Sequence, residues 1–164
     1  HLDSSGRPRI AYATPAGVHL ASAVTITGDF AISRLPGTGP DDDIPALTID
    51  PAGRPTIAWL HDSGGRESVR YARKGAAWPD PSRVGPAPVF TTALAIDLDT
   101  SGALHVLAVG DSVREMTGVG TGFTGETLAR VRDSWYGAMR VSSSDEEMAV
   151  WVTSKGLYMT RRSL

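Results

Sequence analysis

The chain has 164 residues, 41% of them hydrophobic and 21% charged, a balance that excludes an intrinsically disordered protein. A formal net charge of −2 provides no basic field for nucleic acid or for an anionic membrane surface. No apolar run approaches the ~20 residues of a membrane-spanning helix. Cysteine is absent, which excludes disulfides and thiolate metal sites.

Three segments share an Asp-x-x-Gly turn signal followed by an alternating apolar run. They begin at Asp3, Asp50 and Asp99, and the first two match with an offset of 47 residues. The third carries two additional residues, Leu98 and Asp99, before its turn, and a fourth, degenerate copy covers 138–152. An aspartate side chain accepts bonds from nearby amides and glycine adopts positive φ, so the motif predicts the turn of a strand hairpin.

Each copy continues into further short strands. Phe30, Trp78 and Phe123 recur at spacings of 48 and 45 residues, and each leads into a fourth apolar segment. Four strands in each unit of about 45 residues predict an all-β protein made of β-propeller blades, whose sheets cover one another's faces. The predicted repeats of this single propeller segment cover approximately residues 1–40, 41–89, 90–134 and 135–164.

The repeat pattern resembles a known group of proteins. It reads approximately Ala-Leu-x-Ile-Asp-x-x-Gly-x-Pro-x-Ile-Ala-Tyr, followed by Val-x-Tyr-Ala and Trp, and it is clearest over residues 46–78. These repeats resemble the degenerate sialidase-type, or BNR-like, propeller repeats of large bacterial extracytoplasmic proteins. The resemblance implies a propeller fold and a secreted or cell-surface location. Such propellers include glycosidases, lectins and scaffolds, so activity stays open.

The repeat length predicts about fourteen strands, or about three and a half four-stranded blades. One interpretation is a partial propeller that another chain, or the rest of a longer polypeptide, completes. The alternative is a small four-bladed ring with two degenerate blades. In the first case, the unpaired strand edges at residues 7–14 and 157–162 are expected to recruit a partner strand.

The resemblance implies a ligand face formed by loops that join consecutive blades and by loops that join the second and third strands of a blade. These loops supply six candidate ligand-binding residues: His61, Asp62, Phe90, Asp111, Trp135 and Tyr136. The adjacent residues His61 and Asp62 point to opposite sides of an extended chain, so a hydrated loop tip is the alternative for them. Exposed Trp135 and Tyr136 suit stacking on a sugar, whereas packing between blades is their alternative role.

An acidic loop is the candidate metal site. Asp41, Asp42 and Asp43 offer the oxygen ligands that Ca²⁺ prefers, although their spacing is not that of an EF-hand, and a solvated acidic loop is the alternative. No other cofactor is expected. The Gly-x-Gly-x-x-Gly match at 120–125 lacks a preceding buried strand and is interpreted as a turn between strands.

The residues provide little support for catalysis. The sialidase-type pattern requires an arginine triad, and its usual first motif, Arg-Ile-Pro, is approached only by Arg9-Ile-Ala. Arg70, Arg114 and Tyr158 occupy one equivalent position, which suits a solvated strand. We therefore expect a non-catalytic module that binds a glycan or protein ligand or serves as a scaffold. The alternative is part of a sialidase-like glycoside hydrolase whose remaining catalytic residues lie outside this chain.

Overall fold

The computed structural model describes residues 1–25, 28–131 and 133–164. Fourteen strands form four antiparallel sheets, and no described residue is helical. The all-β prediction is confirmed, and the strand number agrees with the repeat length. Within the described residues there is no helix long and apolar enough to cross a lipid bilayer.

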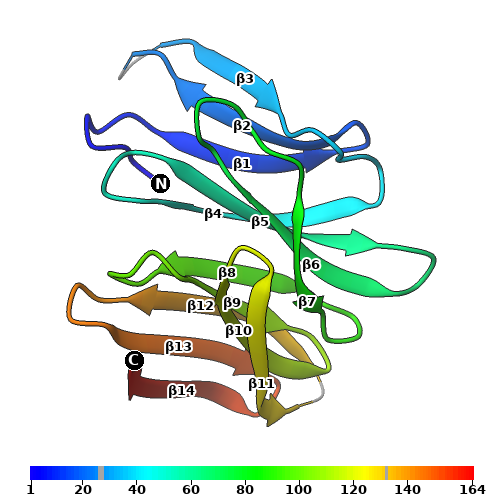
Figure 1. Ribbon diagram of the computed structural model, residues 1–164. Helices are drawn as coiled ribbons and strands as arrows, with labels where there is room; N and C mark the ends of the chain where they lie inside the picture. The colour runs from blue at the N-terminus through cyan, green and yellow to red at the C-terminus, as the bar shows by residue number, and fades with distance from the viewer. Residues whose placement is uncertain (26–27, 132) are drawn as a thin grey trace.

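In every sheet the strands lie side by side in chain order (Figure 1). The first sheet contains β1 (Arg9–Thr14), β2 (Gly17–Ala23) and β3 (Phe30–Arg34). The second contains β4 (Asp42–Ile49), β5 (Pro55–Asp62), β6 (Glu67–Arg73) and β7 (Ser82–Pro86). The third contains β8 (Ala93–Leu98), β9 (Leu104–Val109), β10 (Ser112–Val119) and β11 (Gly122–Arg130). The fourth contains β12 (Ser134–Val141), β13 (Glu146–Thr153) and β14 (Gly156–Ser163).

The same turn recurs in all four sheets. In the first three, Oδ1 of Asp3, Asp50 or Asp99 accepts a hydrogen bond from the amide four residues later, at 3.0, 2.8 and 2.8 Å. The glycines of these turns have φ values of 72°, 77° and 82°, which side chains with a Cβ rarely adopt. In the degenerate fourth copy, Ser142 Oγ accepts the equivalent bond at 3.1 Å and Asp145 takes the glycine position with φ 55°.

The glycine-rich segment 120–125 belongs to a hairpin and not to a nucleotide-binding loop. Gly120 has φ 62° in the turn between β10 and β11, and Val119 pairs directly with Gly122. This is the turn between third and fourth strands that the repeat register predicts.

Apolar side chains fill the three spaces between successive sheets. Trp59, which is fully buried, centres the layer between the first and second sheets. Val106 belongs to the second layer, and Leu107 and Trp151 belong to the third. Strand β9 is buried along both faces because a neighbouring sheet covers each of them. Figure 1 shows the four sheets as an open stack, with β1–β3 at one end and β12–β14 at the other, and ring closure is not seen among the described residues.

One buried carboxylate links three of the sheets. Asp97 on β8 accepts a hydrogen bond from Thr48 Oγ1 of β4 at 3.1 Å and another from the Val141 amide of β12 at 3.0 Å. The two-residue insertion in the third repeat explains this role. It moves the turn to Asp99, so Asp97, which aligns with Asp50 in the sequence, is free to bond across the sheets.

We predict that Asp97→Ala lowers the free energy of unfolding by about 2–4 kcal/mol, because it leaves two buried donors on neighbouring sheets without an acceptor. Urea unfolding followed by tryptophan fluorescence measures the loss. Asp50→Ala is the matched control, since it removes only bonds within one exposed turn, and about 1 kcal/mol is expected for it. Equal losses in the two variants would contradict the inter-sheet role.

Candidate functional site

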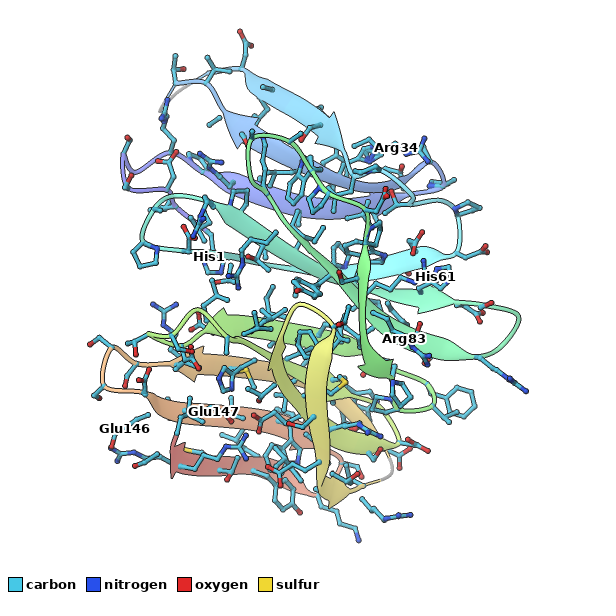
Figure 2. All side chains as sticks on the ribbon, in the orientation of Figure 1. His1, Arg34, His61, Arg83, Glu146 and Glu147 are labelled. Atoms are coloured by element: carbon cyan, nitrogen blue, oxygen red, sulfur yellow. The ribbon has the colours of Figure 1, made fainter. Side chains whose placement is uncertain are left out.

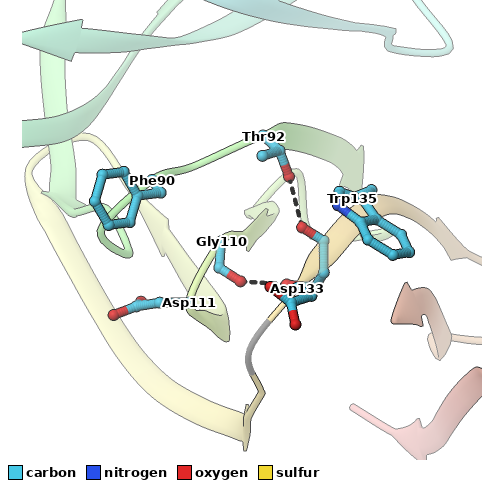
Figure 3. A pocket seen from close by; sticks show the side chains of 7 residues that line it. Phe90, Thr92, Gly110, Asp111, Asp133 and Trp135 are labelled. Atoms are coloured by element: carbon cyan, nitrogen blue, oxygen red, sulfur yellow. Dashed lines mark hydrogen bonds between the residues drawn. The ribbon is translucent and has the colours of Figure 1, made fainter. Parts of the chain in front are cut away.

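Three of the six predicted ligand-face residues line one pocket. Phe90, Asp111 and Trp135 meet where loops of the third and fourth sheets come together, around a cavity of about 440 Å³ (Figure 3). The remaining lining residues are Thr92, Gly110, Asp133 and Ser134. Tyr136 follows on β12 and is 73% exposed, but it is not among the residues that line the pocket.

Hydrogen bonds between loops hold the pocket in shape. Thr92 Oγ1 donates to the carbonyl oxygen of Ser134 at 3.1 Å, and Ser134 Oγ donates to the carbonyl oxygen of Gly110. A Cβ on Gly110 would lie 2.7 Å from the carbonyl oxygen of Val89, so only glycine permits this close approach of the two loops. The walls of the pocket are therefore held by hydrogen bonds from side-chain hydroxyls to the backbone and by the close backbone approach at Gly110.

Irregular backbone presents the two aromatic rings. Phe90 has φ 56° and its side chain is 77% exposed. Trp135 is 46% exposed and lies at a β-bulge in the pairing of β12 with β13, a feature that redirects a side chain. Ile44 and Asp133 also lie near the start of one of the inner strands, which are β4, β8 and β12, and they have φ values of 49° and 63°. Strained backbone of this kind is commonly found at binding sites.

The pocket combines apolar and acidic chemistry. In the view of Figure 3, Phe90 and Trp135 lie on either side of Gly110, with Asp111 below. The Asp111 carboxylate is exposed and accepts a bond from Ser112 Oγ at 3.3 Å, which leaves further acceptor capacity. The arrangement can therefore hold a ligand that has an apolar face and hydrogen-bond donors.

His61 and Asp62 lie outside this pocket and have different partners. Nδ1 of His61 is 2.9 Å from Oδ1 of Asp42, and Trp59 Nε1 donates to the same oxygen at 2.7 Å. Asp62 instead accepts a bond from the Gly65 amide at 2.7 Å and closes the hairpin between β5 and β6. The two neighbours thus act separately, as the alternation of an extended chain predicts.

The acidic loop does not bring its three carboxylates together. Asp42 is 4% exposed and its Oδ2 accepts a bond from the Gly39 amide at 2.7 Å, whereas Asp41 and Asp43 are exposed. Asp42 and Asp43 line another pocket, of about 450 Å³, together with Pro15. Calcium binding by this loop therefore stays a prediction.

A buried ionic cluster lies between the third and fourth sheets. Nδ1 of His105 on β9 is 2.9 Å from Oε2 of Glu147 on β13 and 3.5 Å from Oε1 of Glu115 on β10. On the other side of the ring, Nε2 is 3.3 Å from Oδ2 of Asp99. Arg162 of β14 contacts both glutamates, and the side chains of His105 and the two glutamates are almost fully buried.

The cluster shifts the pKa values of its members. Burial alone lowers the pKa of His105, but hydrogen bonds to Glu115, Glu147 and Asp99 outweigh it and raise the value to about 9. Burial likewise opposes ionisation of Glu147, yet its contacts with His105 lower its pKa overall. The only sequence signal for this cluster is a histidine within the apolar run of β9.

Similarity to known proteins is confined to the fold. No protein-family model and no curated protein matches the sequence. Among solved structures, the chain is similar to the Hadza microbial sialidase Hz136, with a TM-score of 0.64 and 12% identity over 98% of this chain and 43% of that one. It is also similar to a thermostable family-43 glycoside hydrolase (TM-score 0.56, 11% identity, 95% and 71% of the two chains). The third is an endo-arabinase from Bacteroides thetaiotaomicron VPI-5482, with a TM-score of 0.54 and 13% identity over 95% of this chain and 74% of that one.

These values indicate a propeller-type all-β fold. The chain spans less than half the length of the sialidase that it matches. At about 12% identity, the similarity extends to the arrangement of strands and carries no residue-level correspondence.

The raised pKa of His105 predicts how stability varies with pH. The folded protein retains the His105 proton up to about pH 9, whereas the unfolded chain releases it near the ordinary value of 6.5. The stabilisation is therefore complete below pH 6.5 and is lost as the pH rises through 9. We expect the free energy of unfolding to fall by about 1–3 kcal/mol across this range.

Urea unfolding in buffers with a chelator measures this dependence. His105→Gln, which removes the titrating group but keeps a polar side chain, is expected to lose the slope between these pH values. A wild-type stability that is flat or rises with pH would show that His105 is not protonated in the folded cluster.

Proposed function

We propose that this chain is a non-catalytic carbohydrate-binding module of an extracytoplasmic protein, built on part of a β-propeller. The observation that carries the proposal is the pocket in which two exposed aromatic rings, Phe90 and Trp135, accompany the Asp111 carboxylate. Its volume of about 440 Å³ suits a ligand of one or a few sugar rings.

Sugar chemistry fits these side chains. A pyranose has an apolar face of C–H groups that packs on an aromatic ring, and its hydroxyl groups donate to carboxylates. The bonds from Thr92 and Ser134 fix the loops before a ligand arrives, which lowers the entropic cost of binding. Tyr136, His61 and Asp62 stay part of the proposed ligand face, although they do not line this pocket.

Packing contacts favour the non-catalytic function over the glycoside hydrolase alternative. At the repeat position of Arg70 and Arg114, His19 stacks on Tyr12 with ring centroids 5.2 Å apart. Tyr158 stacks in the same way on Trp151, at 6.0 Å. In the first and fourth sheets, the side chain at this position therefore covers an aromatic ring of the neighbouring strand. Sialidase-like hydrolysis is the second candidate, because the fold resembles a sialidase, and it requires residues outside this chain.

We predict that Trp135→Ala weakens carbohydrate binding by at least about tenfold, equivalent to about 1.4 kcal/mol, because it removes the stacking surface. A glycan array identifies the ligand, and isothermal titration with that glycan measures the affinity. Asp111→Asn is expected to weaken binding as well, through the loss of a charged acceptor.

Phe30→Ala is the matched control, since it removes an aromatic ring that is 42% exposed on β3, outside the pocket. Its affinity is expected to equal that of the wild type. Unchanged binding in Trp135→Ala would rule out this pocket as the ligand site. Hydrolysis of a fluorogenic sialoside that Arg70→Ala abolishes would favour the hydrolase alternative instead.

We also propose that further strands complete the propeller, supplied by a second copy of the chain or by the rest of a longer polypeptide. Large apolar side chains on the two end sheets support this: Ile10 and Ile32 on the first are 50% and 63% exposed, and Leu157 and Met159 on the fourth are 71% and 63% exposed. Apolar patches of this kind mark interaction surfaces.

Light scattering together with hydrophobic-dye fluorescence tests this assembly. A dimer with little dye binding indicates completion by a second copy, and a dye-binding monomer indicates completion by other parts of a longer polypeptide. Leu157→Lys with Met159→Lys is expected to reduce association or dye binding in either case. A monomer that binds no dye would contradict the proposal.

A further inference from the structure

We propose that His105, Glu115 and Glu147 form a binding site for a divalent transition-metal ion of the Zn²⁺ or Mn²⁺ class, between the third and fourth sheets. One potential ligand atom from each residue lies within 4.8 Å of the others. One imidazole nitrogen and two carboxylate oxygens are a donor set that such ions accept. Ca²⁺ is excluded as the preferred ion, because it requires six to eight oxygen ligands.

Two buried oxygen atoms in the cluster lack partners. Glu115 Oε2 and Glu147 Oε1 accept no hydrogen bond from any part of the chain that the structure describes. Their side chains are only 1% and 0% exposed, so bulk water does not reach these oxygens to replace the missing hydrogen bonds. An unsatisfied buried carboxylate oxygen is costly, and a cation bound between the two glutamates would compensate for such missing bonds.

The orientation of His105 matches that of a metal ligand. Its Nδ1 faces the two glutamates, while its Nε2 lies 3.3 Å from Oδ2 of Asp99. Metal-binding histidines usually donate their second N–H to a carboxylate, so an ion bound at Nδ1 would displace the proton that His105 carries there in the ion-free cluster. Asp99 is itself held by the Ala103 amide at 2.8 Å and by Ser101 Oγ at 2.7 Å, so this outer partner is fixed by the turn.

Arg162 provides the positive charge next to the two glutamates. Its guanidinium contacts Glu115 and Glu126 and lies 3.3 Å from Oε2 of Glu147, but its side chain is 34% exposed. A polar pocket of about 250 Å³, lined by Glu115, Glu126 and Arg162 among others, reaches the cluster from outside. In the proposed site, an ion would enter through this pocket as the Arg162 side chain moves outward.

The neighbouring glutamate provides a contrast. Figure 2 labels both Glu146 and Glu147 on β13, with Glu146 toward the outside of the fourth sheet. Glu146 forms an exposed pair with Arg161 at 2.7 Å, whereas Glu147 is fully buried. Of these two neighbours on β13, only Glu147 is buried beside His105.

The first test uses Arg162→Ala with ZnCl₂ and MnCl₂ as probes. We expect one ion per wild-type chain by isothermal titration and at least about tenfold tighter binding in Arg162→Ala, because the competing charge is gone. The variant alone is expected to unfold at a lower temperature than the wild type, and the ion is expected to restore the lost midpoint. An ion-pair network without a metal function would give the destabilisation but no restoration.

The second test separates the outer partner from the turn that holds it. Asp99→Asn keeps the side-chain oxygen that accepts the turn amide, but its NH₂ group would donate to Nε2 and move the imidazole proton to Nδ1. We expect about 10–100-fold weaker binding. Asp50→Asn, the same change in the equivalent turn of the second sheet, is expected to leave metal affinity unchanged.

Glu147→Gln and Glu115→Gln are each expected to lose more affinity than Asp99→Asn, since they change direct ligands. Circular dichroism checks that each variant is folded, and His61→Ala controls for binding at another histidine. Three results would each overturn the proposal: no binding of either ion to wild type and Arg162→Ala, unchanged affinity in both folded glutamine variants, or loss of binding in His61→Ala.

Discussion

Each sheet of this protein depends on a neighbouring sheet to cover its apolar faces. Strands β5 and β9 carry apolar side chains on both faces, so neither the second nor the third sheet is stable by itself. Apolar burial in the three layers between the sheets supplies the driving force for the fold. The Asp97 carboxylate adds directional hydrogen bonds between the sheets. Because Asp97 needs donors from β4 and β12 together, it fixes how the inner strands align.

The same packing positions the candidate binding pocket. Phe90 has a positive φ just before β8, and Trp135 lies at a β-bulge at the start of β12. Backbone of this kind is unfavourable by itself and persists only because the surrounding structure holds it. Packing of the inner strands keeps these segments together, and the Gly110 contact allows them to approach closely. Rigid sheets thus support an exposed aromatic surface, an arrangement typical of loop-borne binding sites.

Sheet packing also explains the buried charges. Residues alternate along β9, so His105 points to the same side as Leu107 and meets Glu147 of the next sheet. Isolated burial of either group would be strongly unfavourable, but together with Glu115 and Arg162 they neutralise one another. The cluster joins the two sheets at the cost of leaving two carboxylate oxygens unsatisfied.

The sequence by itself determined the strands, the hairpin turns and the sheet order, because Asp-x-x-Gly turns and alternating apolar residues act over only a few residues. It also placed Phe90, Asp111 and Trp135 on one predicted ligand face, although Trp135 belongs to β12 and not to a loop. Only the tertiary structure decided that these three share a pocket, and that His61 instead contacts Asp42 of the same sheet. The His105 cluster had no clear signal, because His105 and Glu147 are 42 residues apart and meet only when two sheets pack face to face.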